Sequence, residues 1–136
     1  MKKIQRIYLD TSVFGGCFDE EFCKESNLLL SSIKGRKFKL VISTIVSQEL
    51  EKAPLNVQEM YNAIPNECIE ILPDSSEVLQ LTEDYIKAKV ISLKSRNDAL
   101  HVAYATIGHV DAIVSWNFKD LVRLDRIKAF NQINFI

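Results

Sequence analysis

Short runs of β-branched and aromatic residues alternate with longer stretches of helical periodicity along this chain. The runs predict four strands, at residues 4–9, 38–42, 68–72 and 111–115. Helices are predicted at 20–34, 44–50, 54–64, 74–90 and 98–107, followed by two short helical pieces at 119–122 and 125–131 and a last strand at 133–136. Because strands that alternate with helices favour parallel pairing, the pattern predicts an α/β fold with a mostly parallel central sheet between helices.

Local signals set several of these boundaries. Gly15-Gly16 is predicted to break the chain after the first strand, and Gly35 to end the first long helix. Ser43-Thr44 is a predicted helix cap, because short hydroxyl side chains accept hydrogen bonds from free amides at helix starts. The segment at 74–77 resembles a capping box, and Asn97 is predicted to cap the helix that follows it.

Length, charge and cysteine content limit the number of domains, the mode of nucleic-acid binding and the cellular location that the chain can have. The 136 residues fit one domain, 1–136, that is long enough to bury a core. The formal net charge is −1, so any contact with nucleic acid has to use a local basic patch. No stretch has the apolar length of a signal peptide or of a membrane-spanning helix, which needs roughly 20 residues. The cysteines form no C-x-x-C pair, which predicts free thiols and a cytoplasmic location; they are Cys17, Cys23 and Cys68.

Three acidic residues lie beside apolar residues that should be buried. Asp10 follows the first strand, Glu49 lies in the helix after the second strand, and Asp98 opens a later helix. In parallel sheets, ligands bind at the carboxyl ends of the strands, so the three side chains can meet at one edge. A carboxylate next to a core is costly unless it is paired or bound to a metal. The hypothesis is a cage of three carboxylates for a hard cation, Mg²⁺ or Mn²⁺.

Each acid also has a simpler explanation when it is taken alone. Asp10 can cap a turn or a helix, and Glu49 can be a solvated helix residue. Asp98 in a first helical turn gains about 0.3–1 kcal/mol from the helix dipole. Three carboxylates together would repel one another, and at least one pKa should rise. A divalent ion removes that conflict and can orient a water for in-line attack on phosphorus.

Four segments resemble the successive motifs of the PIN domain, and together they span almost the whole chain. They are Tyr-Leu-Asp-Thr-Ser-Val-Phe at 8–14, Val-Ser-Gln-Glu-Leu at 46–50, Asn-Asp-Ala-Leu-His-Val-Ala at 97–103 and Ile-Val-Ser-Trp-Asn-Phe-Lys at 113–119. The chain looks most similar to the VapC-like toxins of bacterial toxin–antitoxin pairs. The resemblance implies a three-layer α/β/α sandwich, a metal-dependent endoribonuclease, a cognate antitoxin as partner and a homodimer. It also implies that Asp10, Glu49 and Asp98 bind the metal.

The fourth site position departs from the commoner pattern. Many PIN domains carry an Asp two residues after the Ser or Thr of the last core strand, whereas here Asn117 follows Ser115. Asn117 offers a neutral oxygen, so a second metal site would be weaker or would fill only with substrate present. Asp120 is a candidate substitute, and a solvated surface residue is the alternative. Similar proteins often continue through a further strand, which leaves open whether this chain is naturally short or truncated.

Further residues are predicted around the acidic site. Thr11 and Ser12 can position water or phosphate beside Asp10. Phosphate-contacting residues are also predicted at the rim, namely Lys94, Arg96, Ser115 and Lys119. None of these contacts reads RNA sequence. His101 is expected to pack at the edge of the site, and Trp116 to serve in core or subunit packing.

Two other functions remain open at this stage. One is a PIN-fold binding module with weak catalysis that acts through protein or RNA contacts, which Asn117 makes credible. The other is a phosphatase or phosphotransfer domain with Asp10 as nucleophile. Ser12 stands where a haloacid-dehalogenase-like site would need a second Asp, which counts against the phosphatase.

Overall fold

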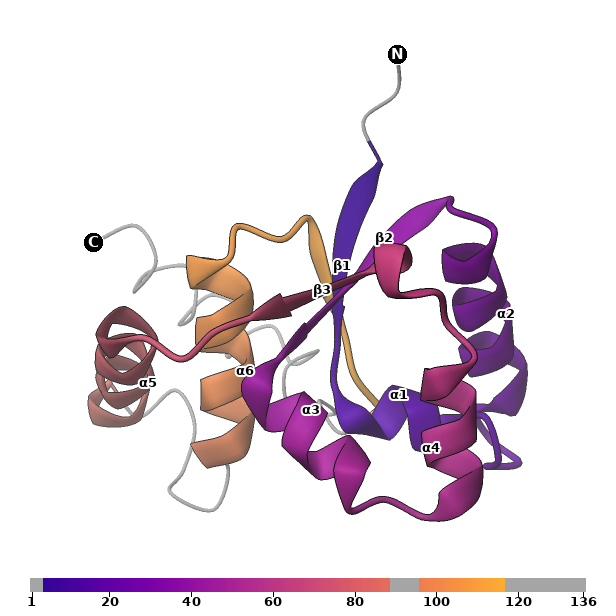
Figure 1. Ribbon diagram of the computed structural model, residues 1–136. Coiled ribbons are helices and arrows are strands. Elements are labelled where there is room, and N and C mark those ends of the chain that lie inside the picture. Colours follow the sequence, from indigo (N-terminus) through magenta and orange to yellow (C-terminus); the bar gives the residue numbers. More distant parts are fainter. Residues whose placement is uncertain (1–3, 89–95, 117–136) are drawn as a thin grey trace. The chain divides into compact units, whose positions relative to one another are not determined.

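The predicted alternation of strands and helices is present in the computed structural model, which describes residues 4–88 and 96–116 (Figure 1). The chain divides into two compact units, which are described separately. The first unit comprises Met1–Pro73 and Val110–Trp116 and contains the sheet. In the second unit, the described residues are Asp74–His109 without 89–95, and they form two helices.

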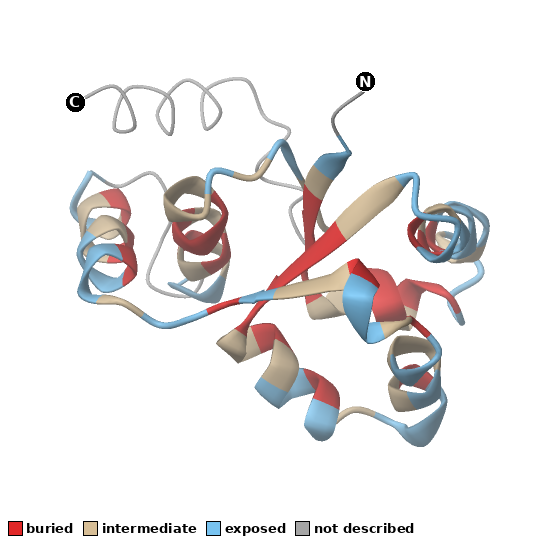
Figure 2. Cartoon of the chain, turned by 45° about the horizontal axis from the view of Figure 1, so that its top comes forward, coloured by how far each residue is buried: buried red, intermediate tan, exposed pale blue. Residues whose placement is uncertain are grey.

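The sheet has four parallel strands in the order β3-β2-β1-β4. They are β1 (Gln5–Leu9), β2 (Phe38–Ser43), β3 (Ile69–Leu72) and β4 (Ala112–Val114). Each strand matches a predicted run to within two residues at either end. The two central strands, β1 and β2, are the most buried, as Figure 2 shows, because a parallel sheet is covered on both faces and its inner strands are almost continuously apolar.

Helices α1 and α2 of the first unit connect β1 to β2, and helices α3 and α4 connect β2 to β3 (Figure 1). They are α1 (Thr11–Gly16), α2 (Cys23–Lys34), α3 (Thr44–Glu51) and α4 (Leu55–Asn62), and a short 3₁₀ turn, η1 (Asn66–Cys68), precedes β3. Helix α2 contacts β2, α3 contacts β2 and β3, and α1 contacts the other three helices. The aromatic rings of Phe14 and Tyr61 meet edge to face at 5.8 Å, which joins α1 to α4.

Helix α1 differs from the sequence prediction. Gly15-Gly16 was expected to break the chain, but both glycines are helical and α1 ends at Gly16. The helix begins because the Asp10 carboxylate accepts a hydrogen bond from the Ser12 amide at 3.1 Å, and it is held by the burial of Val13 and Phe14. Buried apolar contacts and an N-terminal cap therefore outweigh the low helix propensity of two glycines.

The helices of the second unit are α5 (Ser76–Lys87) and α6 (Arg96–Ile107), which pack against each other. Ser75, within the segment 74–77 that resembles a capping box, caps α5 by accepting a hydrogen bond from the Val78 amide at 3.1 Å.

The carboxylate of Asp74 accepts a hydrogen bond from the Tyr104 hydroxyl of α6. Asn97 lies inside α6 and does not cap it, since the helix begins one residue earlier. The pieces predicted at 119–122, 125–131 and 133–136 lie outside the described residues. In the described ranges, no helix has the length and apolar character needed to span a bilayer.

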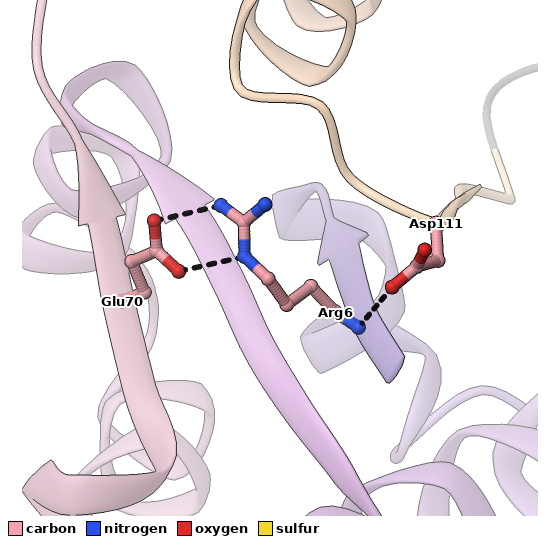
Figure 3. A network of polar contacts seen from close by, with 3 residues as sticks. All are labelled: Arg6, Glu70 and Asp111. Atoms are coloured by element: carbon pink, nitrogen blue, oxygen red, sulfur yellow. Dashed lines mark hydrogen bonds and ion pairs between the residues drawn. The ribbon is translucent and has the colours of Figure 1, made fainter. Parts of the chain in front are cut away.

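A polar network joins the strands at the amino-terminal part of the sheet (Figure 3). The Arg6 guanidinium extends from β1 past β2 and donates two hydrogen bonds, of 2.9 and 2.7 Å, to the Glu70 carboxylate on β3. The Arg6 amide donates to the Asp111 carboxylate at 2.8 Å, and the Asp111 amide donates back to the Arg6 carbonyl. This network helps to fix the strand order at the edge opposite to the predicted site.

Candidate active site

The carboxyl ends of three neighbouring strands bring polar residues to one edge of the sheet. Asp10 follows β1, Ser43 ends β2 and Ser115 follows β4. Because the strands are parallel, these ends share an edge, where α/β sheets bind ligands. Asp10 is only 2% exposed, so its carboxylate has to be satisfied by protein groups or a ligand.

Two hydroxyl groups hold the Asp10 carboxylate. Ser12 Oγ donates to Oδ1 at 2.5 Å, in addition to the Ser12 amide, and Ser115 Oγ donates to Oδ2 at 2.5 Å. Each hydroxyl has one proton, so both are committed to Asp10 and the 3.3 Å approach of the two serine oxygens is not a strong hydrogen bond. A carboxylate has about four acceptor positions, and three donors leave about one for a further ligand.

Glu49 lies on α3, whose start is fixed by the sheet. Ser43 caps this helix by accepting a hydrogen bond from the Val46 amide at 3.3 Å, and its oxygen also lies 2.8 Å from the buried Tyr8 hydroxyl. Although Glu49 as a residue is exposed, partial burial of its carboxyl raises its pKa, and the Asp10 charge raises it further. The two carboxylates are therefore close enough to repel each other.

Thr11 lies beside this acidic pair. Its hydroxyl favours the charged form of Glu49 and so lowers the Glu49 pKa, against the larger effect of burial. The Thr11 oxygen is nevertheless buried and has no hydrogen bond of good geometry to any described residue. A buried, under-satisfied hydroxyl next to two carboxylates is a suitable partner for a metal-bound water or a phosphate oxygen.

Asp98, the third predicted ligand, lies in the first turn of α6 and is partly buried. It belongs to the second unit, so its meeting with Asp10 and Glu49 stays a prediction. Within the described part of the sheet unit, no third Asp, Glu, His or Cys joins those two acids in a metal-binding group. A third Asp, Glu, His or Cys ligand would therefore have to come from outside that part of the chain.

The sequence between residues 6 and 119 matches the family model described as PIN domain. This match covers most of the chain. The chain belongs to the PIN domain family. Comparison with curated proteins gives no significant match.

A solved structure supports the same fold for this PIN domain. It is the crystal structure of VapBC2 from Rickettsia felis bound to a DNA fragment from their promoter. The similarity covers 90% of this chain and 95% of that chain, with a TM-score of 0.58 and 16% sequence identity. The predicted fold class, an α/β sandwich with a parallel central sheet, is confirmed.

The predicted rim residues of the PIN domain differ in what they contact. Arg96 is paired with Glu83 at 2.5 Å, so its guanidinium is engaged within the second unit. Ser12 and Ser115 donate their protons to Asp10, and their predicted contact with substrate stays a prediction. Other predicted site residues lie outside the described ranges, namely Lys94, Asn117 and Lys119.

Trp116 packs in the sheet unit of the PIN domain, in agreement with its predicted packing role. Its ring stacks on Phe22 with 4.8 Å between centroids and 3° between planes, and its indole N–H donates to Ser26 Oγ at 2.8 Å. Sequence reasoning missed Ser26, because a serine within a helix carries no local signal of a distant partner. His101 is buried in α6, as its predicted packing role requires.

Proposed function

We propose that this PIN domain is a metal-dependent endoribonuclease that hydrolyses RNA phosphodiester bonds, and that it is the toxin of a toxin–antitoxin pair. The observation that carries the proposal is the buried Asp10 carboxylate, held by two serine hydroxyls beside a Glu49 whose pKa is raised. Two carboxylates that repel each other at the carboxyl edge of a parallel sheet are poised for a cation.

The donor set suits Mg²⁺ or Mn²⁺. Asp10 and Glu49 supply carboxylate oxygens, and Asp98 would add a third carboxylate. Among the described residues of the sheet unit, no cysteine thiol or histidine imidazole joins Asp10 and Glu49. Hard cations prefer such oxygen ligands and retain several waters. When bound, the ion would supply Lewis acidity and lower the pKa of a water.

The chain's own residues would then position the RNA. The Thr11 hydroxyl is available to orient a water or a phosphate oxygen, because no described group uses it well. Asn117 would add a neutral oxygen, and Lys94 and Lys119 would bind backbone phosphates without reading sequence. Hydrolysis by attack of water on phosphorus would leave a 5′-phosphate and a 3′-hydroxyl.

The toxin role is supported by family membership and by the fold shared with a chain of the VapBC2 structure. It would give the chain a cognate antitoxin as partner, a cytoplasmic location and, by family analogy, a homodimeric state. A small neighbouring gene that encodes a DNA-binding protein, and a complex of the two proteins on co-expression, would support this role. Separate elution of the two co-expressed proteins, with no complex between them, would argue against it.

RNA cleavage by matched variants tests the nuclease proposal. The wild-type protein should cut RNA in Mn²⁺ and not in EDTA, and its products should carry 5′-phosphates. Asp10→Asn and Asp98→Asn should each lower the rate more than about 100-fold, since loss of outer-shell partners alone costs about 10- to 100-fold. Glu25→Gln, an exposed position on α2, is the matched control and should cut normally. Full activity in both Asp variants would refute the proposal.

Asn117 favours a second candidate function, a PIN-fold binding module with weak catalysis. A neutral side chain at the fourth position removes a charge that a second metal ion would use. Such a module would bind RNA or a protein partner without Asp10-dependent affinity for Mn²⁺. Calorimetric titration with Mn²⁺ separates the two functions, because the nuclease requires that affinity.

A further inference from the structure

A chain of hydrogen bonds leads from Trp116 to the Asp10 carboxylate. The Trp116 amide donates to Ser12 Oγ at 3.0 Å, and Ser12 Oγ donates to Asp10 Oδ1 at 2.5 Å. The amide occupies a lone pair of the Ser12 oxygen, so the single hydroxyl proton is directed to the carboxylate. The position of the Trp116 backbone therefore controls how Ser12 presents its proton to Asp10.

The Trp116 side chain is anchored on two sides. Its indole N–H donates to Ser26 Oγ at 2.8 Å, and its ring stacks in parallel on Phe22. Ser26 is fully buried, and an indole N–H that points into the protein needs a partner, so the hydrogen bond fixes one ring orientation. Both partners are contributed by the α1–α2 region, far in sequence from β4.

Gly16 leaves just enough space for the Trp116 indole and the Ser26 hydroxyl, and none for a side chain of its own. A Cβ at this position would lie 2.5 Å from Ser26 Oγ and 2.6 Å from the indole nitrogen of Trp116. Both distances are far below van der Waals contact, so any side chain here would displace the ring or the serine. The end of α1 is therefore fitted to the indole, and α1 is the helix that Asp10 caps.

We propose that Trp116, anchored by Ser26 and Phe22 and accommodated by Gly16, is a positioning residue that orients the Asp10 carboxylate through Ser12. The proposal rests on the proposed function, because it assigns Asp10 to a metal. It gives Ser12 and Trp116 a role in metal affinity that is separate from contact with RNA. Groups that hold a metal ligand in place typically change metal affinity when they are removed.

Mn²⁺ affinity of the full chain, measured by calorimetry, tests this role. Ser12→Ala should weaken Mn²⁺ binding roughly 10- to 100-fold, and Ser26→Ala and Trp116→Phe should weaken it by a smaller factor. Trp116→Phe keeps an aromatic ring for Phe22 but loses the indole N–H. Saturating Mn²⁺ should restore most of the cleavage rate in Ser26→Ala, and the KM for RNA should not change.

Trp116 is the only tryptophan of the chain, so intrinsic tryptophan fluorescence reports on this residue alone. Mn²⁺ should quench the fluorescence of the wild-type protein at the concentration that calorimetry gives, and Asp10→Asn should abolish the quenching. Ile33→Val is the control, because Ile33 is buried on the same helix as Ser26 and lies outside the hydrogen-bond chain. This variant should lose stability and keep wild-type Mn²⁺ affinity.

The outcomes separate this inference from the nuclease proposal. If folded Ser26→Ala and Trp116→Phe both bind Mn²⁺ as tightly as the wild-type protein, the positioning role is wrong and the nuclease proposal stands. If the wild-type protein shows no Mn²⁺ binding that depends on Asp10, both proposals fall. If either Ser26→Ala or Trp116→Phe does not fold, the other variant still tests the positioning role, because each removes one partner of the hydrogen bond between Trp116 and Ser26.

Discussion

The hydroxyl of Tyr8 lies 2.8 Å from Ser43 Oγ, the oxygen that caps helix α3. Tyr8 is fully buried on the central strand β1, and α3 carries Glu49. One pair of hydroxyl groups thus connects the core of the sheet to the start of the helix that presents an acidic site residue. The position of Glu49 is therefore set from within the core.

Replacing Ser43 with Ala should destabilise the protein by about 2 kcal/mol. The change removes a helix cap, worth about 0.5–2 kcal/mol, and removes the hydrogen bond between Ser43 and the buried Tyr8 hydroxyl, worth about 0.5–1.5 kcal/mol. Ser75→Ala is the matched control, because Ser75 caps α5 from a partly exposed position and its side chain makes no second hydrogen bond to a described residue. Urea denaturation should show a larger loss for Ser43→Ala, and equal losses would contradict the coupling.

Two adjacent glycines should respond to alanine in opposite directions. Gly16→Ala should destabilise the protein by about 1–3 kcal/mol, because its Cβ would overlap Ser26 and Trp116. Gly15→Ala should stabilise it by about 0.4–1 kcal/mol, because Gly15 is helical and a Cβ there would meet nothing within 4 Å. Thermal melting of both variants measures the difference, and destabilisation of equal size would show that the indole does not limit this helix end.

Glu49→Gln should stabilise the metal-free protein at neutral pH. Burial and the Asp10 charge raise the pKa of Glu49, so the folded state binds its proton more tightly than the unfolded chain. Protonated Glu49 therefore contributes fully to the free energy of unfolding below the ordinary Glu pKa of about 4.3. This contribution is lost as the pH rises through the higher pKa of Glu49 in the folded state. Gln removes this loss, because it carries no charge.

The pH dependence of the melting temperature checks this prediction. Glu49→Gln should melt above the wild-type protein at pH 7, and the gap should shrink as the pH falls toward 4. An equal difference in melting temperature at both pH values would mean that the surroundings of Glu49 do not raise its pKa in the folded protein.

Two arginine–glutamate pairs in the described part of the sheet unit should differ in strength. The Arg6–Glu70 pair is bidentate, with side chains 24% and 38% exposed, whereas the Arg36 and Glu67 side chains are 62% and 59% exposed. A double-mutant cycle should give a coupling of about 0.5–1 kcal/mol for Arg6–Glu70 at low salt. The same cycle should give no measurable coupling for Arg36–Glu67, and equal values would contradict the role of burial.

The fold was largely predictable, because the strands are compact apolar runs separated by helical periodicity. Helix α1 was not, since Gly15-Gly16 is a common chain-breaking signal and the packing that overrides it involves residues distant in sequence. A glycine in a helix costs about 1 kcal/mol relative to alanine. Close packing against Ser26 and Trp116 explains this cost at Gly16, whereas a Cβ at Gly15 would meet nothing within 4 Å.

The acidic residues of the proposed site were predicted from their motifs, but the hydrogen bonds of the hydroxyls could not be. Ser115 lies 105 positions from Asp10, and only the folded sheet brings its proton to the carboxylate. Ser26 has no sequence signal, because its function depends on the indole of Trp116. Residues that position a site can be identified only from contacts between distant parts of the sequence, whereas charged candidate ligands can be recognised in the sequence from their side-chain chemistry.

Calorimetric titration of Mn²⁺ into the wild-type protein, Asp10→Asn and Asp98→Asn tests most directly whether one metal site joins the two units. The wild-type protein should bind Mn²⁺, and each Asp variant should lose most of that affinity, with no further loss in the double variant. Wild-type affinity in Asp98→Asn, with binding abolished in Asp10→Asn, would contradict a shared site and leave the metal to the sheet unit alone.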